Sequence, residues 1–312
     1  MKLREFRRSD GPRLFGLLKT EFPEEEAMLG MRPDGFERIL RRLYRADTRL
    51  LLGLLRAVHR SPFHLYVVEE DGTIAAMTML SFAARAGFLS TVVVAPEFRR
   101  RGYARQLIER ARAEAARRGR PYVALRVLAA NAPARTLYAS AGYEQLDQES
   151  FFVLEGPIAF PADHAPGSIR PFRRSDAGPL AEVANRTAPE KVREVLPLQA
   201  RSLSGNRWAD RIFSAETGAW VVDRGQGAEA YLAATSTPTT EAAHLSTPIA
   251  SGSVAPELLL GLVRTAGVWL AARRPARIVT SVPESAGPAR RALEEAGFRE
   301  TMGHLTLFRS SR

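Results

Sequence analysis

A group of residues suited to anion binding follows a short apolar strand, which ends with Val92, Val93 and Val94. The loop after Pro96 and the start of the next predicted helix consist of Arg99, Arg100, Arg101, Gly102, Tyr103, Ala104 and Arg105. The first N–H groups of a helix have no partner inside the helix and lie at the positive end of its dipole, so they bind anions readily. Because Gly102 allows close backbone approach and the arginines add positive charge, this order predicts a phosphate site. A solvated arginine turn is the alternative.

Two residues further along the chain have types and positions suited to acyl transfer. Asn131 stands near the start of a short helix predicted over residues 133–140, and Tyr138 lies within it. A tyrosine hydroxyl has a pKa of about 10, so it holds a proton at neutral pH and can give it to a leaving group. Taken alone, Asn131 would be a helix cap and Tyr138 a core residue.

Together, these features resemble the cofactor motif of the GNAT N-acetyltransferase superfamily. The matching elements are R-x-x-G-x-A after a strand that ends V-x-P, then Asn131, Tyr138 and Gly142-Tyr143. The resemblance covers roughly residues 1–155. It implies that loop amides at residues 99–105 hold the pyrophosphate of acetyl-CoA, and that the backbone of residues 92–94 holds the pantetheine arm and the acetyl carbonyl. It also implies that Asn131 contacts the cofactor and that Tyr138 protonates the leaving thiolate.

The residue that accepts a proton from the substrate is left open by the sequence. Some protein-N-terminus acetyltransferases of this superfamily carry Glu five residues before the Asn, where this chain has Arg126. Candidate bases are Glu69, Glu70 and Glu97, or a chain of waters, and each carboxylate could equally be a surface charge. Arg126 could pair with an internal acid or meet an acidic group of the substrate.

The resemblance implies an enzyme that moves an acetyl group from acetyl-CoA to a primary amine of a small molecule or a protein. A catalytically silent module that binds acyl-CoA or docks a partner is the second hypothesis. The retention of Tyr138 beside Asn131 favours the enzyme. The sequence does not identify the acceptor.

The elements that must position these residues form a mixed α/β fold with a mostly antiparallel central sheet flanked by helices. Apolar periodicity predicts the order β-α-α-β-β-β-α-β-α-β-β in the first half, with a helix over residues 34–59 and a hairpin turn at Asp71-Gly72. Tyr143 to Leu154 is expected to complete the sheet.

The chain also repeats itself, which predicts two domains of one fold. Residues 4–10 return at 170–176 with a single difference, and four shorter matches follow in the same order. We expect an acetyltransferase domain over 1–156, a linker over 157–167 and a degenerate copy over 168–312. The second copy has Ala286 and Leu293 where the first has Asn131 and Tyr138, and it lacks the arginine loop. One cofactor site per chain is therefore expected, while the second copy could support the first, complete the substrate cleft or form a homodimer.

The composition of the chain bears on metal binding, nucleic-acid binding and location in the cell. The chain of 312 residues has no cysteine, and its five histidines show no metal-ligand spacing, so no metal is expected. Its net charge of +11 comes almost entirely from arginine, a bias that genome composition can produce, so nucleic acid is not the expected partner. No stretch is long and apolar enough to cross a membrane and the first residues lack a signal core, which together predict a cytoplasmic protein.

Overall fold

The computed structural model describes residues 1–11, 13–14, 16–17, 63–161, 167–203 and 214–312. The helix predicted over residues 34–59 lies outside these ranges. Within them, the two halves of the chain have the same succession of elements.

The first half begins with a strand and a helical turn and continues, after residue 62, with a hairpin. Its described elements are β1 (Lys2–Glu5), η1 (Arg8–Asp10), β2 (Phe63–Glu70), β3 (Thr73–Phe82), β4 (Ala86–Val94), η2 (Pro96–Phe98), α5 (Tyr103–Arg117), β5 (Tyr122–Leu128), α6 (Ala132–Ser140) and β6 (Glu144–Glu155). Asp71 and Gly72 both have positive φ, 48° and 76°, so the predicted two-residue turn between β2 and β3 is confirmed.

The second half follows a similar order where the structure describes both halves. Its described elements are β7 (Ile169–Pro171), η3 (Arg174–Asp176), α7 (Ala177–Thr187), α8 (Glu190–Val195), α9 (Ala200–Leu203), β8 (Glu216–Asp223), β9 (Ala228–Ser236), β10 (Ala242–Leu245), β11 (Ile249–Ala250), α11 (Pro256–Ala271), β12 (Arg277–Pro283), α12 (Gly287–Glu295) and β13 (Arg299–Ser310).

The repeated sequence motif forms the same structure twice. Arg4 donates two hydrogen bonds to the carboxylate of Asp10, at 2.8 and 2.9 Å, and Arg170 donates two to Asp176, both at 2.8 Å. The bond to arginine is the main reason that the pKa values of both aspartates are lowered. The paired arginine and aspartate hold the turn after the first strand of each half, which explains why the motif occurs twice.

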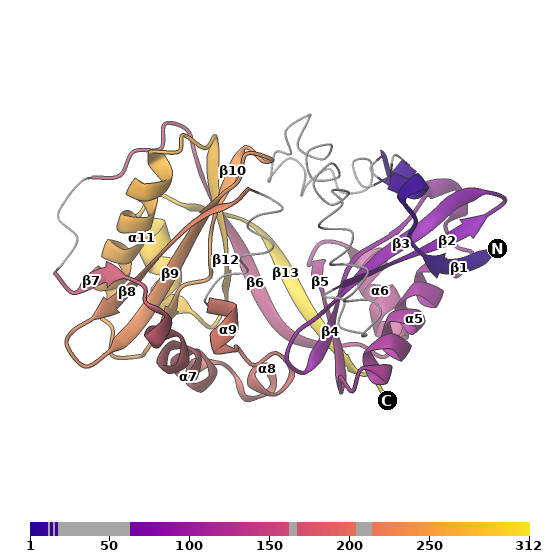
Figure 1. Cartoon of the computed structure of the whole chain (residues 1–312), viewed down its shortest axis with the longest axis horizontal. Coiled ribbons are helices and arrows are strands. Elements are labelled where there is room, and N and C mark those ends of the chain that lie inside the picture. Colours follow the sequence, from indigo (N-terminus) through magenta and orange to yellow (C-terminus); the bar gives the residue numbers. More distant parts are fainter. Residues whose placement is uncertain (12, 15, 18–62, 162–166, 204–213) are drawn as a thin grey trace.

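The strands that the structure describes belong to one continuous sheet, and the two halves exchange their last strands within it. The order is β1-β2-β3-β4-β5-β13-β6-β12-β10-β9-β8-β7, with β11 paired to β9. Thus β13 of the second half pairs with β5 of the first, and β6 of the first half pairs with β12 of the second. Figure 1 shows β6 and β13 side by side at the centre of the molecule.

This pairing corrects two expectations about the end of the first domain. The sequence predicted two final strands there, whereas the structure has the single strand β6. That strand does not close its own sheet beside β5, because β13 takes the place next to β5. The two hydrophobic cores show the same exchange, since Leu305 and Leu307 of β13 pack in the first core and Phe152 of β6 packs in the second.

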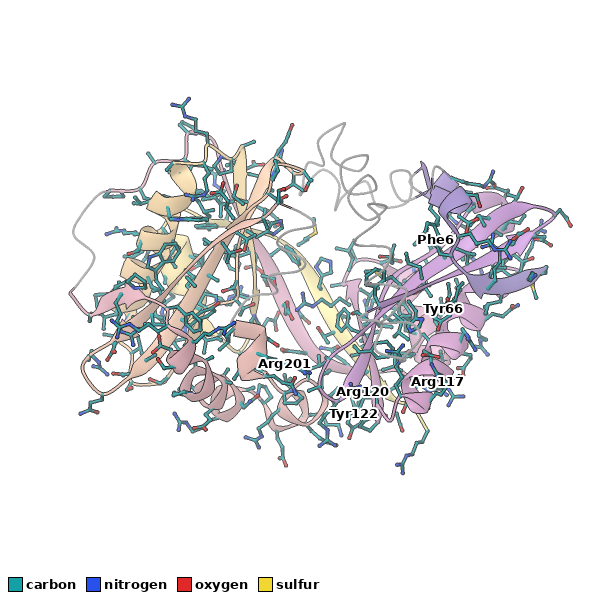
Figure 2. The ribbon with its side chains drawn as sticks, in the orientation of Figure 1. Phe6, Tyr66, Arg117, Arg120, Tyr122 and Arg201 are labelled. Atoms are coloured by element: carbon teal, nitrogen blue, oxygen red, sulfur yellow. The ribbon has the colours of Figure 1, made fainter. Side chains whose placement is uncertain are left out.

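A short helix of the second half also reaches the first half. The hydroxyl of Tyr122, at the start of β5, donates a hydrogen bond to Glu194 of α8 (Figure 2). Lys191, one turn away on the same helix, lies 5.8 Å from the centroid of the Tyr122 ring. The two halves are therefore joined along the sheet and at its lower edge in the view of Figure 2.

Candidate active site

The central feature of the site is a gap between two neighbouring parallel strands. β4 pairs with β5 from Ala86 opposite Tyr122 to Leu89 opposite Leu125, and the pairing then stops. A bulge in β4 between Ser90 and Val93 accompanies the separation, and Thr91 has a φ of 58°. The last residues of β4 therefore leave β5, so that one edge of β4 is open beyond Leu89.

The predicted residues of β4 lie at this gap. Ala95 N donates to Ala75 O at 2.9 Å, so the alternation of an antiparallel ladder turns the backbone groups of Val94 away from β3 and toward the gap. Val92 lies in the bulge, and the side chain of Val93 is buried in a small core with Leu14. The side chain of Val93 thus anchors the strand, while the backbone of Val94 faces the opening.

The N-terminus of α5 has no side-chain cap among the described residues. Gly102 is the N-cap residue with a φ of 80°, and no side chain caps the helix. The first helical bond runs from Gln106 N to Gly102 O at 3.1 Å, so the N–H groups of Tyr103, Ala104 and Arg105 have no partner in the helix. A Cβ placed on Gly102 would have no atom within 4 Å, which shows open space directly over the loop. The predicted loop therefore has the backbone geometry that a phosphate needs.

Two of the loop arginines are held by the protein itself. Arg101 donates to Glu70 at 3.1 Å and lies over the ring of Phe98, 5.2 Å from its centroid. Arg99 Nε donates to Val94 O at 3.4 Å. These side chains place positive charge beside the loop.

The remaining loop residues differ in their surroundings. Arg100 is exposed and has a φ of 65°. The buried Tyr103 donates its hydroxyl proton to Glu70, which raises the pKa of that tyrosine. Arg105 donates to Ser140 Oγ at 3.1 Å and so ties the start of α5 to the end of α6. The sequence motif and the helix that carries Tyr138 are thereby held together.

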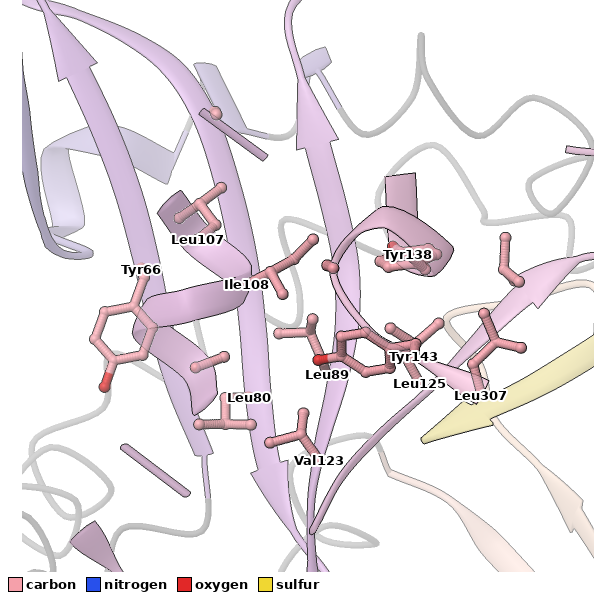
Figure 3. Close-up of a cluster of buried hydrophobic side chains, with 14 of the residues drawn as sticks. Tyr66, Leu80, Leu89, Leu107, Ile108, Val123, Leu125, Tyr138, Tyr143 and Leu307 are labelled. Atoms are coloured by element: carbon pink, nitrogen blue, oxygen red, sulfur yellow. The ribbon is translucent and has the colours of Figure 1, made fainter. Parts of the chain in front are cut away.

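Asn131 and Tyr138 occupy the positions that the sequence predicted for them. Asn131 is the N-cap of α6, and its side-chain oxygen accepts a hydrogen bond from Ala134 N at 3.1 Å. Tyr138 is buried in the first core, with its ring 5.7 Å from that of Tyr143 (Figure 3). Burial raises the pKa of Tyr138 to about 12, so the hydroxyl is protonated throughout the neutral range.

The three carboxylates considered as bases lie on the surface and make other contacts. Glu69 accepts from Arg4 at 2.6 Å, Glu70 binds Arg101 and Tyr103, and the exposed Glu97 lies 3.5 Å from an exposed arginine. Each of the three carboxylates is therefore engaged by at least one positively charged side chain.

Arg126 pairs with an internal acid, which was one of the two roles left open for it. Its guanidinium donates to Glu149 Oε1 at 2.7 Å, across the exchanged strand β13. Beside this pair lie His304 and Thr306 of β13, which the sequence did not connect with the first domain because they are far from it along the chain.

The second half has the same frame without the same opening. β10 pairs in parallel with β12 from Ala242 to His244, as β4 does with β5. Beyond that point Thr247 Oγ1 donates to Ser281 O at 2.9 Å, and Thr280 Oγ1 donates to Ser246 O at 3.4 Å. These bonds close the position where the first half has its gap.

The residues matched by the repeat occupy equivalent places. Ala286 is the N-cap of α12 without a side-chain bond, and Leu293 is fully buried where the first half has Tyr138. Phe298 N donates to Leu293 O at 3.0 Å, just as Tyr143 N donates to Tyr138 O. The backbone arrangement is therefore the same in both halves, while Asn131 and Tyr138 are replaced by Ala286 and Leu293.

In the part of the chain that the structure describes, no group of three or more His, Cys, Asp or Glu side chains could hold a metal ion. Over the same residues, no helix combines the length and apolar character that a membrane span requires.

Comparison with known proteins agrees with this geometry. Residues 17–143 match the model of the acetyltransferase (GNAT) family. A GCN5-related N-acetyltransferase from Sphaerobacter thermophilus has a similar structure, with a TM-score of 0.64 and 17% identity over 100% of this chain and 96% of that one. A tandem GNAT protein from the clavulanic acid biosynthesis pathway gives a TM-score of 0.58 and 18% identity over 80% of this chain and 83% of that one. At these identities the structures show a shared fold. The search of curated proteins gave no significant match.

Proposed function

We propose that this chain, in which residues 17–143 match the acetyltransferase (GNAT) family, transfers an acetyl group from acetyl-CoA to a primary amine. The observation that supports this most strongly is the uncapped N-terminus of α5 beside the gap between β4 and β5. The first feature suits a pyrophosphate and the second suits the pantetheine arm, and they lie next to each other along the chain.

The residues present fit this cofactor. The N–H groups of Tyr103, Ala104 and Arg105 would bind phosphate oxygens in the open space over Gly102. The backbone of Val94, turned into the gap, would bind polar groups of the pantetheine arm. Asn131 keeps its side-chain NH2 group available, because its cap bond uses only the oxygen.

The chemistry needs a neutral amine and a protonated leaving group. The thioester of acetyl-CoA supplies an acyl group activated toward nitrogen. Tyr138 would deliver a proton to the departing sulfur, because its raised pKa keeps the hydroxyl protonated at neutral pH. Since a thiol, with a pKa of about 8.5, is a stronger acid than this hydroxyl, the transfer would have to occur in place as the C–S bond breaks, and Tyr138 would then regain a proton from solvent.

Two measurements, made one after the other, test this proposal: acetyl-CoA binding and thiol release. Isothermal titration calorimetry with acetyl-CoA should give one binding site per chain. Thiol release is then followed with butylamine, glucosamine and a peptide with a free N-terminus as acceptors. Binding with turnover supports the enzyme, and binding without turnover on any amine supports the silent acyl-CoA-binding module. Absence of binding would exclude both.

A further inference from the structure

Three buried polar atoms lie together on the exchanged strands, and none of them has a partner. They are Glu149 Oε2, His304 Nδ1 and Thr306 Oγ1. The side chains are more than nine-tenths buried, with exposed fractions of 7%, 8% and 3%. Buried polar atoms in folded proteins are nearly always hydrogen-bonded, so three orphans on adjacent strands indicate a site that binds a polar group.

The strand register places these side chains on one face of the sheet. His304 lies opposite Glu149 on β6, and Thr306 lies opposite Arg126 on β5. Directly opposed residues have Cβ atoms about 4.5–5.5 Å apart. Leu305 and Leu307 point into the core that contains Tyr138, so the alternate residues His304 and Thr306 point to the other face.

This face adjoins the gap that would receive the thioester. Arg126 and Leu128 are the residues of β5 beyond the point where β4 departs, and they lie opposite Thr306 and His304. The cluster is thus one strand away from the opening, on the face opposite to α5 and α6. An acceptor entering from this face would meet the cluster before it meets the thioester.

The charges around His304 come from two neighbouring strands. Arg126 of β5 and the carboxylates of Glu149 and Asp147 of β6 face the same side, and the ring of Phe151 lies 4.6 Å from that of His304. Burial lowers the pKa of His304, and the charge of Arg126 lowers it further. Burial also raises the pKa of Asp147. Since Arg126 occupies Glu149 Oε1, the free oxygen Oε2 is available to a second cation.

We propose that Glu149, Thr306 and His304 form the acceptor end of the active site, where the first two hold a primary ammonium group and His304 accepts its proton. This inference rests on the proposed function and identifies the acceptor as a cation at its reacting end. The second half of the chain then contributes to catalysis through β13, although it has no cofactor loop of its own.

The proton balance of the step is complete. The ammonium nitrogen loses one proton to the free Nδ1 of His304, and the nitrogen lone pair forms the new C–N bond as the C–S bond breaks. The second proton leaves the nitrogen for solvent as the amide forms, and the Tyr138 hydroxyl gives its proton to the sulfur and regains one from solvent. Protonated His304 returns its proton to solvent, so the products are the amide, the thiol and one released proton.

The decisive variant is His304→Gln, which keeps a polar side chain of similar length but cannot take up a proton at neutral pH. We expect unchanged affinity for acetyl-CoA by calorimetry and a loss of kcat/KM on the order of 100-fold with the best acceptor. In the wild type, kcat/KM should fall as the pH drops through the lowered pKa of His304, below 6.5, because the imidazole becomes charged. That acid limb should be missing in the variant.

His244→Gln is the matched control. His244 lies on β10 of the second half, and burial lowers its pKa as well, but β12 and β6 separate β10 from the strand β13 that carries His304. This variant should retain the wild-type rate and pH profile. Glu149→Gln provides a second test, since it should raise the KM for the amine at least about 10-fold while kcat and acetyl-CoA affinity change little.

A further readout does not depend on turnover. The imidazole NMR signal of His304 is assigned as the one that is absent from the spectrum of His304→Gln. This signal should shift when butylamine is added to the wild-type protein saturated with acetyl-CoA. A wild-type pH profile in His304→Gln, or an unmoved His304 signal with every amine tested, would overturn this proposal and leave acetyl-CoA binding intact. If the wild type does not bind acetyl-CoA, the proposed function itself fails.

Discussion

The two halves of the molecule differ most clearly where the two parallel strands of each half meet. In the first half, the pairing of β4 with β5 ends at Leu89. In the second half, hydrogen bonds from the Thr247 and Thr280 hydroxyls connect the residues that follow β10 to β12. The helix starts differ as well, because α11 has Pro256 at its first position and Glu257 in its first turn, while α5 has neither. Proline lacks an N–H group and the glutamate repels anions, so the second frame is unsuited to phosphate.

The two halves therefore share one fold but differ in the features that surround the end of the first parallel strand. The first half keeps an open strand edge beside an uncapped helix start, and the second keeps the packing and supplies the strand that pairs with β5. Four substitutions test this division of roles, from the largest expected effect to the smallest.

The largest effect is expected for Gly102→Glu. Its side chain would stand in the open space over the loop, at a φ of 80° that costs an ordinary residue roughly 1–2 kcal/mol, and its charge would repel the pyrophosphate. Calorimetry should show a loss of acetyl-CoA affinity of at least about 100-fold. Gly252→Glu, in the corresponding loop of the second half, also meets open space and should leave the affinity unchanged. Equal losses in both variants would contradict the assignment of the site to one half.

Tyr138→Phe tests the polar group that the second half replaces by Leu293. We expect kcat to fall on the order of 100-fold with acetyl-CoA affinity near the wild-type value, because the core ring is kept and only the proton donor is lost. Tyr143→Phe is the control, since its buried hydroxyl has no partner and its ring packs against Tyr138. Unchanged turnover in Tyr138→Phe would show that Tyr138 is a core residue only.

Leu307→Ala tests whether the halves are thermodynamically one unit. Leu307 belongs to the second half in sequence and to the first core in space, and its truncation should lower the free energy of unfolding by about 3 kcal/mol. All three tryptophans lie in the second half, so urea unfolding followed by tryptophan fluorescence reports on that half alone. Its midpoint should shift together with that of the circular dichroism signal. A shift in one signal without the other would show that the halves unfold independently.

The smallest effect, on the free energy of unfolding, is expected for Thr280→Val in the second half. Thr280→Val keeps the shape of the side chain and removes its bond to Ser246 O, which should cost about 1 kcal/mol in urea unfolding. The variant should still bind a single acetyl-CoA per chain, because the loop before α11 has no anion site. A second binding event would mean that the threonine bridge alone keeps this half inactive.

Much of the frame could be predicted from the sequence because its signals are local. The loop at Gly102, the turn at Asp71-Gly72 and the start of α6 at Asn131 each depend on a few adjacent residues, and each is found where expected. The equivalence of Leu293 with Tyr138 could also be predicted, because the sequence repeat aligns α12 with α6.

The exchange of strands could not be predicted in this way. β6 and β13 stand at equivalent positions of the repeat and have the same length, so nothing local in the sequence decides which sheet each one completes. The choice depends on long-range packing, such as that of Leu307 in the first core. The orphaned polar cluster was missed for the same reason, since Glu149 and His304 become neighbours only through that exchange.

The exchanged strand also sets an order of events during synthesis. β5 can fold against β4 early, but its other edge has to wait for residues 299–310, which the ribosome adds long after the first half has been made. At a rate of about 5–20 residues per second, that edge stays unpaired for roughly ten seconds or more. An exposed strand edge is a template for pairing with other chains, so the nascent protein passes through an interval of vulnerability to aggregation. His304 arrives with the same strand, and on the proposal made above the enzyme gains its activity only when this interval ends.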